Sequence, residues 1–233
     1  MLARTGAGWT YSGRLEALCD YGVHSLRLDV DSENGELHSL TTEVCVADSS
    51  RGEIEVADWR QLQGGADHSG TTDRELTPPL YTLWATVVDG NLHGGSPVVS
   101  GDLVLVPIAD FGSGSHGGVV ALDALSGEER WRYLAGAGVR SAPAATADVV
   151  VMAGLDGLVH AVSLDRGELL WTYQVAAAVE PMNRNLYASP TIDGGTVYVG
   201  NKREFVALDL ASGEPVWSLA PGDKGFFGSY VTP

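Results

Sequence analysis

Short apolar runs separated by turn residues recur through the last three-quarters of the chain. Three of them begin with a proline, at Pro97, Pro143 and Pro190, and read PVVSGDLVLVPI, PAATADVVVMAG and PTIDGGTVYVGN. In each run, Gly or Asp divides two short stretches rich in β-branched residues, a pattern typical of a β-hairpin. Proline is tolerated as the first residue of a strand, where its missing N–H faces no partner. The pattern therefore predicts short antiparallel strands rather than long helices.

A second motif recurs in phase with these hairpins. It reads A-x-[DS]-x-x-[SR]-G-E-x-x-W, and its three gapless copies span Ala121–Trp131, Ala161–Trp171 and Ala207–Trp217. The three tryptophans are separated by 40 and 46 residues, and Trp84 lies 47 residues before Trp131. We interpret Trp84 as the mark of an earlier, degenerate unit. Self-similarity at this period is typical of repeat folds.

One unit can be drawn as a hairpin, a Gly turn, a third strand, an S-G-E turn and a fourth strand that carries Trp. Four antiparallel strands in about 45 residues make one blade of a β-propeller. The sequence therefore predicts an all-β fold, in which an incomplete β-propeller of about four antiparallel four-stranded blades occupies residues 58–233. A small strand-rich segment, residues 1–57, precedes it.

Each motif residue has a predicted structural role. The Asp side chain accepts backbone N–H bonds in the turn, the Gly adopts a positive φ, and the Trp packs between its own blade and the next. These predicted docking residues are Ala121, Asp123, Gly127, Trp131, Ala161, Gly167, Trp171, Ala207, Asp209, Gly213 and Trp217.

The net charge of the chain disfavours some classes of binding partner. The 233 residues hold 14 Lys and Arg against 30 Asp and Glu, which gives a net charge of -16. Such an acidic chain repels phosphate backbones and anionic lipids, so nucleic acid is not an expected partner. No apolar run approaches the roughly 18 to 20 residues that span a bilayer. The opening MLARTGAGWT lacks the apolar core of a secretory signal, and the compartment stays open.

At these motifs the sequence resembles the PQQ-like β-propeller repeat family. The first and third copies match the family's tryptophan-docking motif in full, and the middle copy departs from it at Ser163 and Arg166. The stretch Asp58–Gly65, DWRQLQGG, with Gly70 beyond it, is similar to the W-x-Q-x-x-G…G segment that opens such propellers. The resemblance covers about residues 58–233.

The resemblance implies two kinds of biochemistry. Quinoprotein dehydrogenases of this family hold pyrroloquinoline quinone (PQQ) and Ca²⁺ on the propeller axis, with an Asp base, an acidic calcium ligand and usually a vicinal disulfide. Other members are non-catalytic, such as the propeller subunit of the outer-membrane β-barrel assembly machinery, which binds partner proteins. Members of both kinds mostly work outside the cytoplasm. The segment from Gly13 to Ser50 also resembles the linker that joins such propellers to metallophosphoesterases.

The residues favour the non-catalytic interpretation. Cys19 and Cys45 are the two cysteines of the chain, so a vicinal disulfide is excluded, although these two could bridge neighbouring strands. Phosphoesterase metal motifs are incomplete, with Gly90-Asn91-Leu92-His93 as a near miss. We therefore expect no cofactor and no complete catalytic constellation. The function expected first is a protein-interaction scaffold; the alternatives are a fragment of a larger enzyme whose active site lies elsewhere, and a PQQ- and Ca²⁺-dependent dehydrogenase.

An insertion between two repeats is the candidate binding loop. The segment from Val179 to Tyr187 accounts for most of the longer step between tryptophans, and insertions of this kind map to the face of a propeller. Its candidate contact residues are Asn183, Arg184, Asn185 and Tyr187. The repeats stop before ring closure, so we expect the open blade edges to meet the remaining blades of a longer polypeptide, a partner protein or a second copy.

Overall fold

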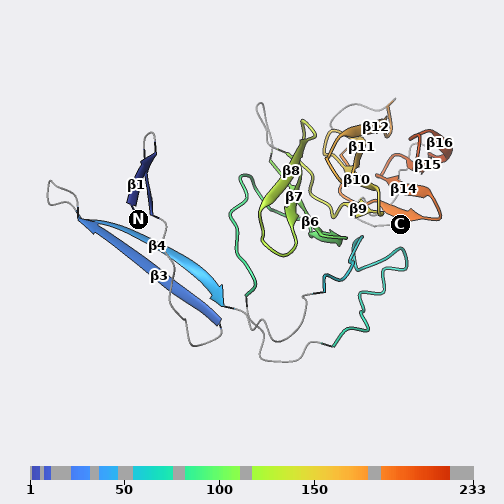
Figure 1. Ribbon diagram of the computed structural model, residues 1–233. Coiled ribbons are helices and arrows are strands. Elements are labelled where there is room, and N and C mark those ends of the chain that lie inside the picture. Colours follow the sequence, from blue (N-terminus) through green and yellow to red (C-terminus); the bar gives the residue numbers. More distant parts are fainter. Residues whose placement is uncertain are drawn as a thin grey trace. The chain divides into compact units, whose positions relative to one another are not determined.

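The computed structural model describes residues 2–5, 8–11, 22–31, 37–46, 55–75, 82–110, 117–177 and 185–220 (Figure 1). The chain divides into two compact units. One consists of Met1–Glu53 with Leu76–Trp84, and the other of Ile54–Glu75 with Ala85–Pro233. Among the described residues, no helix is long and apolar enough to cross a membrane.

The first unit contains two antiparallel hairpins. Strand β1 (Leu2–Thr5) pairs with β2 (Gly8–Tyr11), and β3 (Gly22–Asp31) pairs with β4 (Leu37–Val46). This confirms the strand-rich N-terminal segment. In the β3–β4 register Cys45 lies opposite Val23, and Cys19 lies outside the described residues. The Cys19–Cys45 bridge therefore stays a prediction.

The second unit contains three four-stranded antiparallel sheets, which we call blades 1, 2 and 3. In each blade the strands lie side by side in the order of the sequence, which confirms the all-β, incomplete propeller. Blade 1 consists of β5 (Val98–Ser100), β6 (Leu103–Ile108), β7 (Gly118–Asp123) and β8 (Glu129–Leu134). Blade 2 consists of β9 (Ala144–Ala145), β10 (Val149–Ala153), β11 (Leu158–Ser163) and β12 (Leu169–Gln174). Blade 3 consists of β13 (Thr191–Asp193), β14 (Thr196–Gly200), β15 (Phe205–Asp209) and β16 (Pro215–Leu219).

The unit expected around Trp84 is different from these blades. Residues 82–97 contain no strand, so the described residues form three four-stranded blades where the sequence predicted about four. Part of the reason is local, because Gly90, Gly94 and Gly95 follow Trp84 closely. Gly90 and Gly94 have φ values of 130° and 90°, which are incompatible with a regular strand.

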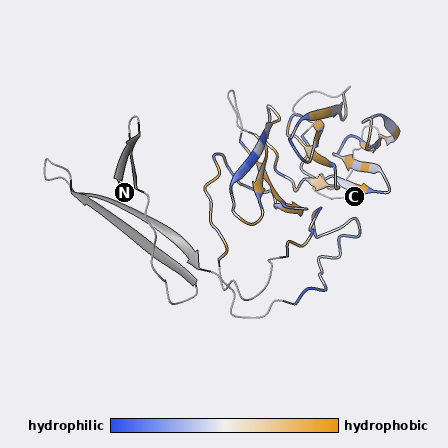
Figure 2. Cartoon of the chain, viewed as in Figure 1, coloured by the Kyte–Doolittle hydropathy of each residue, from blue (hydrophilic) through white to orange (hydrophobic). Residues whose placement is uncertain are grey.

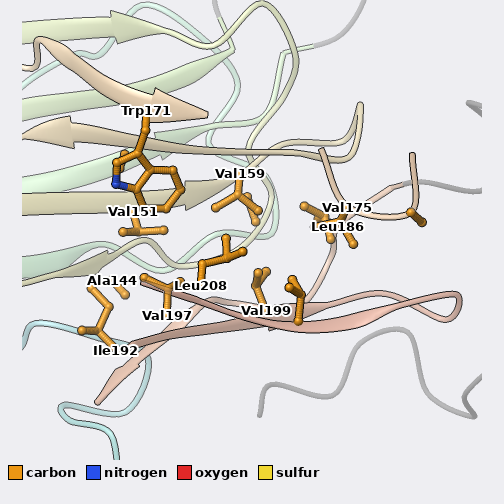
Figure 3. Close-up of a cluster of buried hydrophobic side chains, with 14 residues drawn as sticks. Ala144, Val151, Val159, Trp171, Val175, Leu186, Ile192, Val197, Val199 and Leu208 are labelled. Carbon is orange, nitrogen blue, oxygen red and sulfur yellow. The ribbon is translucent and has the colours of Figure 1, made fainter. Parts of the chain in front are cut away.

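Each junction between two blades is an apolar core. One buried cluster joins blades 1 and 2, and the other joins blades 2 and 3 (Figure 3). Successive residues of β10 alternate between them: Val150 and Met152 belong to the first cluster, and Val151 and Ala153 to the second. Blade 2 is thus covered on both faces, which explains the continuous apolar run VVVMA. The outer strand β8, in contrast, is hydrophilic (Figure 2).

The tryptophan of one blade docks on the turn of the next. The Trp131 indole Nε1–H donates to the Leu164 carbonyl at 2.8 Å, and Trp171 donates to the Leu210 carbonyl at the same distance. A methyl group placed on Gly167 would lie 2.5 Å from Cε3 of Trp131, and one on Gly213 would lie 2.5 Å from Cδ2 of Trp171. The glycines therefore provide the space that each indole occupies, in addition to a positive φ.

The third tryptophan lies in a different environment. In its own sheet Trp217 faces Ala207, in the same register as Trp131 with Ala121 and Trp171 with Ala161. Trp131 and Trp171 are 8% exposed, whereas Trp217 is 44% exposed. Its ring meets Phe205 and Tyr198 of its own blade, with centroids 5.7 and 6.2 Å apart. The described residues thus place two of the three predicted indoles at a blade junction and leave the third on an open face.

The three turns of the docking motif share one backbone path, and the first and third turns also share one side-chain pattern. The amide of Gly127 donates to the Asp123 carbonyl, and equivalent bonds join Gly167 to Ser163 and Gly213 to Asp209. Oδ1 of Asp123 accepts bonds from the backbone and hydroxyl of Ser126, which lower the pKa of the Asp123 carboxyl. The hydroxyl and amide of Ser212 lower the pKa of Asp209 in the same way.

A buried histidine lies between blades 1 and 2. His160 of β11 is 4% exposed, and its Nδ1 lies 3.0 Å from the hydroxyl of Tyr133 of β8. Its Nε2 has no hydrogen-bond partner. Burial lowers the pKa of His160, and the nearby Asp156 carboxylate opposes this shift only partly. The folded protein therefore favours the neutral imidazole.

This lowered pKa makes stability depend on pH. The unfolded chain protonates His160 near its ordinary pKa of 6.5, before the folded protein does. The His160 contribution is therefore complete above that pH and is lost as the pH falls below it. We expect the free energy of unfolding to fall more steeply for the wild type than for His160→Gln between about pH 7.5 and about pH 5.5. Urea unfolding at several pH values measures this, and parallel slopes would contradict it.

Candidate functional site

One short segment contacts the first strand of all three blades. Strand β9 lies against both β5 and β13, so these three short strands are neighbours. The segment Asp58–Gly65, which we call the hub segment, pairs with each of them. Trp59 exchanges two backbone bonds with Val99 of β5, both 2.9 Å long, and the Arg60 carbonyl accepts from Ala145 of β9 at 2.8 Å. The third link, to β13, is made by a side chain.

That side chain is Gln61. Its Nε2 donates to the Ile192 carbonyl at 2.9 Å, and its Oε1 accepts from the Ile192 amide at 2.7 Å. The carboxamide thus takes the place of a backbone partner in a strand ladder. Gln61 is 7% exposed and Ile192 6%, so these groups depend on each other rather than on solvent.

Further contacts fix the two ends of the hub segment. At its start, Oδ1 of Asp58 accepts from the Gly101 amide at 2.8 Å, and Oδ2 pairs with Arg60 at the same distance. After its end, His68 Nδ1 lies 2.7 Å from the Leu62 carbonyl and His68 Nε2 lies 3.0 Å from the Thr191 hydroxyl. The segment is therefore held at blade 1, at blade 2 and, twice, at β13 of blade 3.

Two cavities lie beside the hub segment. The first has a volume of about 310 Å³ and the second of about 380 Å³. The first is lined by Asp58, Arg60, Gln61, Gly64, Gly65, Ala145, Thr146 and Ile192. The second is lined by Leu62, Gly94, Ser96, Arg140, Ser141, Ala142, Tyr187 and Ser189. The second cavity brings together the residues around the Ser-Pro and Ala-Pro steps that precede β5, β9 and β13.

Only some of the binding residues predicted from the sequence lie at or near the second cavity. Tyr187 is half-buried and lines the second cavity, and Asn185 is half-buried nearby in the chain. Asn183 and Arg184 lie outside the described residues. Leu186, between Asn185 and Tyr187, is fully buried in the core of blades 2 and 3. The predicted loop thus contains one core residue.

The predicted docking residues form the outer part of the blades and not this site. Their alanines, Ala121, Ala161 and Ala207, are fully buried opposite the tryptophans. Sequence reasoning missed the site residues Arg140, Ser141 and His68. The Ser-Pro and Ala-Pro steps, which recur in phase with the tryptophans, were the available signal for the cavity.

The described residues do not fit a calcium site for quinone chemistry. They contain no group of three or more His, Cys, Asp or Glu side chains that could hold a metal ion. Oδ1 of Asp110 accepts the Asn91 amide at 2.7 Å, and Oδ1 of Asp156 accepts the Leu158 amide at 3.1 Å. Both carboxylates are thus bonded to backbone amides of the chain.

Comparisons with known proteins agree with this fold. The family model described as outer membrane protein assembly factor BamB matches residues 57–225. BamB of Yersinia pestis is 30% identical over 158 residues, 62% of this chain and 37% of that protein. BamB of Burkholderia pseudomallei is 27% identical over 195 residues, 64% of this chain and 51% of that protein. The chain thus spans about a third to a half of the length of these relatives.

A solved structure with an enzymatic role shares the fold. The quinohemoprotein alcohol dehydrogenase of Comamonas testosteroni aligns with a TM-score of 0.58 at 18% identity, over 70% of this chain and 27% of that protein. At this identity the likeness establishes the propeller fold and not the activity.

A substitution of Gln61 tests whether the hub segment joins the blades. Gln61→Met keeps the length of the side chain but leaves the Ile192 amide and carbonyl without partners. We expect a loss of about 2 kcal/mol or more in the free energy of unfolding. The control, Gln63→Met, changes an exposed side chain and should cost less than about 0.5 kcal/mol. Equal losses in urea unfolding would show that the Gln61 carboxamide does not join the blades.

Proposed function

Because the chain belongs to the family described as outer membrane protein assembly factor BamB, we propose that it is a non-catalytic β-propeller module that binds other proteins. The name of these relatives, outer membrane protein assembly factor, refers to protein assembly and not to a reaction. Since the chain spans only part of those relatives, we propose that it supplies part of such a scaffold. An outer-membrane role of this kind also favours a location outside the cytoplasm.

The observation that carries the proposal is the anchoring of the insertion after β12. On one side, the Ala176 amide donates to Oε2 of Glu204, which belongs to blade 3. Val175 and Ala176 are buried in the core between blades 2 and 3. On the other side, Leu186 enters the same core, beside Val175, and its amide donates to the Gly154 carbonyl (Figure 3).

This anchoring suits a binding loop. The described residues that flank residues 178–184, Ala176 and Leu186, are held by packed blades, and the candidate contact residues Asn183 and Arg184 belong to the segment between them. When buried contacts hold the residues that flank a loop, the loop loses less conformational entropy on binding a partner. We propose that Asn183, Arg184, Asn185 and Tyr187 contribute to contacts with a protein partner.

The open face of blade 3 supports a second protein contact. Val216, Trp217 and Leu219 of β16 are 61%, 44% and 55% exposed. Because Trp131 and Trp171 are covered by a neighbouring blade, we propose that Trp217 is covered by further propeller blades or by a partner. An exposed apolar strand of this kind otherwise favours self-association.

The binding loop can be tested without disturbing the core. Residues 179–184 are replaced by a Gly-Ser sequence of equal length, and Leu186 is kept because it is buried. The control replaces Ala147, an exposed residue of the turn between β9 and β10, by Ser. Each tagged protein is cross-linked in extracts of the source cells, and the captured proteins are quantified by mass spectrometry.

We expect the loop variant to capture at least about tenfold less of a defined partner than the wild type, a loss of about 1.4 kcal/mol. The Ala147→Ser control should capture as much as the wild type, and both variants should melt near the wild-type temperature. Unchanged capture by the loop variant would remove the loop from the binding surface. Absence of any protein enriched by the wild type would contradict the scaffold role itself.

A further inference from the structure

The two blade junctions differ in one titratable side chain. His160 of β11 faces blade 1, on the same side of its strand as Val162, which belongs to the apolar cluster between blades 1 and 2. Of the other described histidines in this unit, His68 contacts the Leu62 carbonyl in the hub segment, and His93 is exposed. Among the described residues, a buried histidine thus lies at the first junction, between blades 1 and 2, and none lies at the second, between blades 2 and 3.

Few groups act on the charge of this imidazole. The Tyr133 hydroxyl of β8 lies 3.0 Å from Nδ1, and the two rings meet edge to face with centroids 5.6 Å apart. Burial lowers the pKa of His160, and the Asp156 carboxylate, in the turn between β10 and β11, opposes this shift only partly. Strands β10 and β12, which flank β11, contain no charged residue. The charged side chains of β8 bond to other partners; they are Glu129, Arg130 and Arg132.

The closed junction shields the second ring nitrogen from water. Nε2 of His160 is buried without a hydrogen-bond partner, and the residue is 4% exposed. A protonated imidazole carries a hydrogen on both nitrogens, so the closed junction would bury an N–H without an acceptor together with a positive charge. Protonation is therefore coupled to the separation of β8 from blade 2, which lets water reach the ring.

The first junction is held in two different ways. At the hub segment, the consecutive residues Trp59 and Arg60 bond through their backbones to the first strands of blades 1 and 2. At the outer strand β8, Trp131 and Tyr133 contact blade 2 through their side chains. Neighbouring repeats open locally at a lower cost than the whole fold. The outer contact can thus open while the hub segment keeps the blades together.

We propose that acid opens the first junction at its outer strand, with the buried His160–Tyr133 contact as the group that responds to pH. The open form protonates His160 near the ordinary pKa of 6.5, whereas the closed form holds the ring neutral to lower pH. The ratio of open to closed forms therefore rises by up to about tenfold between about pH 7.5 and about pH 5.5. Opening exposes the apolar surface around Trp131. This response goes beyond the proposed scaffold role and does not depend on the binding loop, whose flanking residue Leu186 packs at the second junction.

Two indole N–H groups report the two junctions separately. The Trp131 indole bonds across the first junction and the Trp171 indole across the second, both at 2.8 Å. Their exchange in heavy water is followed by heteronuclear NMR at about pH 7.5 and about pH 5.5. Each rate is compared with that of N-acetyl-tryptophanamide at the same pH, which gives a protection factor. The proteins are the wild type, His160→Gln and the control His93→Gln, whose side chain is exposed.

We expect the protection of Trp131, relative to that of Trp171, to fall about three- to tenfold on acidification of the wild type and of the His93→Gln control. In His160→Gln the ratio should stay constant. If His160→Gln fails to fold, the wild-type ratio, measured together with the ring-nitrogen shifts of His160, still decides, because Trp171 is an internal reference.

Three results would overturn the proposal. A wild-type ratio that is constant with pH would show that the first junction does not respond to acid. An equal loss of protection at both indoles would show that acid destabilises the blades as a whole. The same fall in His160→Gln, or in the wild type without any change in the His160 ring shifts, would assign the response to other groups.

Discussion

The packing of an indole on the glycine turn of the next blade is the interaction on which this fold depends. Each docked indole removes about 150 to 250 Å² of apolar surface from water, worth about 4 to 6 kcal/mol before entropy costs. Its N–H also satisfies a carbonyl of the neighbouring turn, Leu164 for Trp131 and Leu210 for Trp171. Because the contact needs a residue without Cβ, the motif specifies both partners, the Trp of one repeat and the Gly of the next.

The hub segment provides a second constraint at the opposite side of each sheet. The tryptophans join the outer strands to the neighbouring turns, whereas Trp59, Arg60 and Gln61 join the first strands of blades 1, 2 and 3. Cavities beside this segment are consequently walled by residues from several blades. The residues that line these cavities come together only when the blades are assembled.

Periodic features could be predicted from the sequence, and contacts without a period could not. The hairpins and S-G-E turns repeat, so three copies supported one another, and even Ser163 in place of Asp preserves the backbone bond of its turn. Gln61 and Ile192 are 131 residues apart, and no local pattern connects them. Leu186 belongs to the segment that is predicted to be a loop because it interrupts the repeat, yet the core of blades 2 and 3 buries this side chain. The exposure of Trp217 depends on what covers β16, which its motif does not encode.

The free energy of unfolding of Gly167→Ala, compared with Gly101→Ala, tests the docking interaction most directly. Both glycines have positive φ, 67° and 59°, so both variants carry a backbone cost of about 1 to 2 kcal/mol. A methyl group at Gly167 also meets the Trp131 ring, whereas at Gly101 none of the described residues lies within 4 Å. We predict that Gly167→Ala is less stable than Gly101→Ala by a further 1 to 3 kcal/mol or so, the usual cost of overpacking. Equal stabilities would contradict the account, because the turn would then not be where the indole is held.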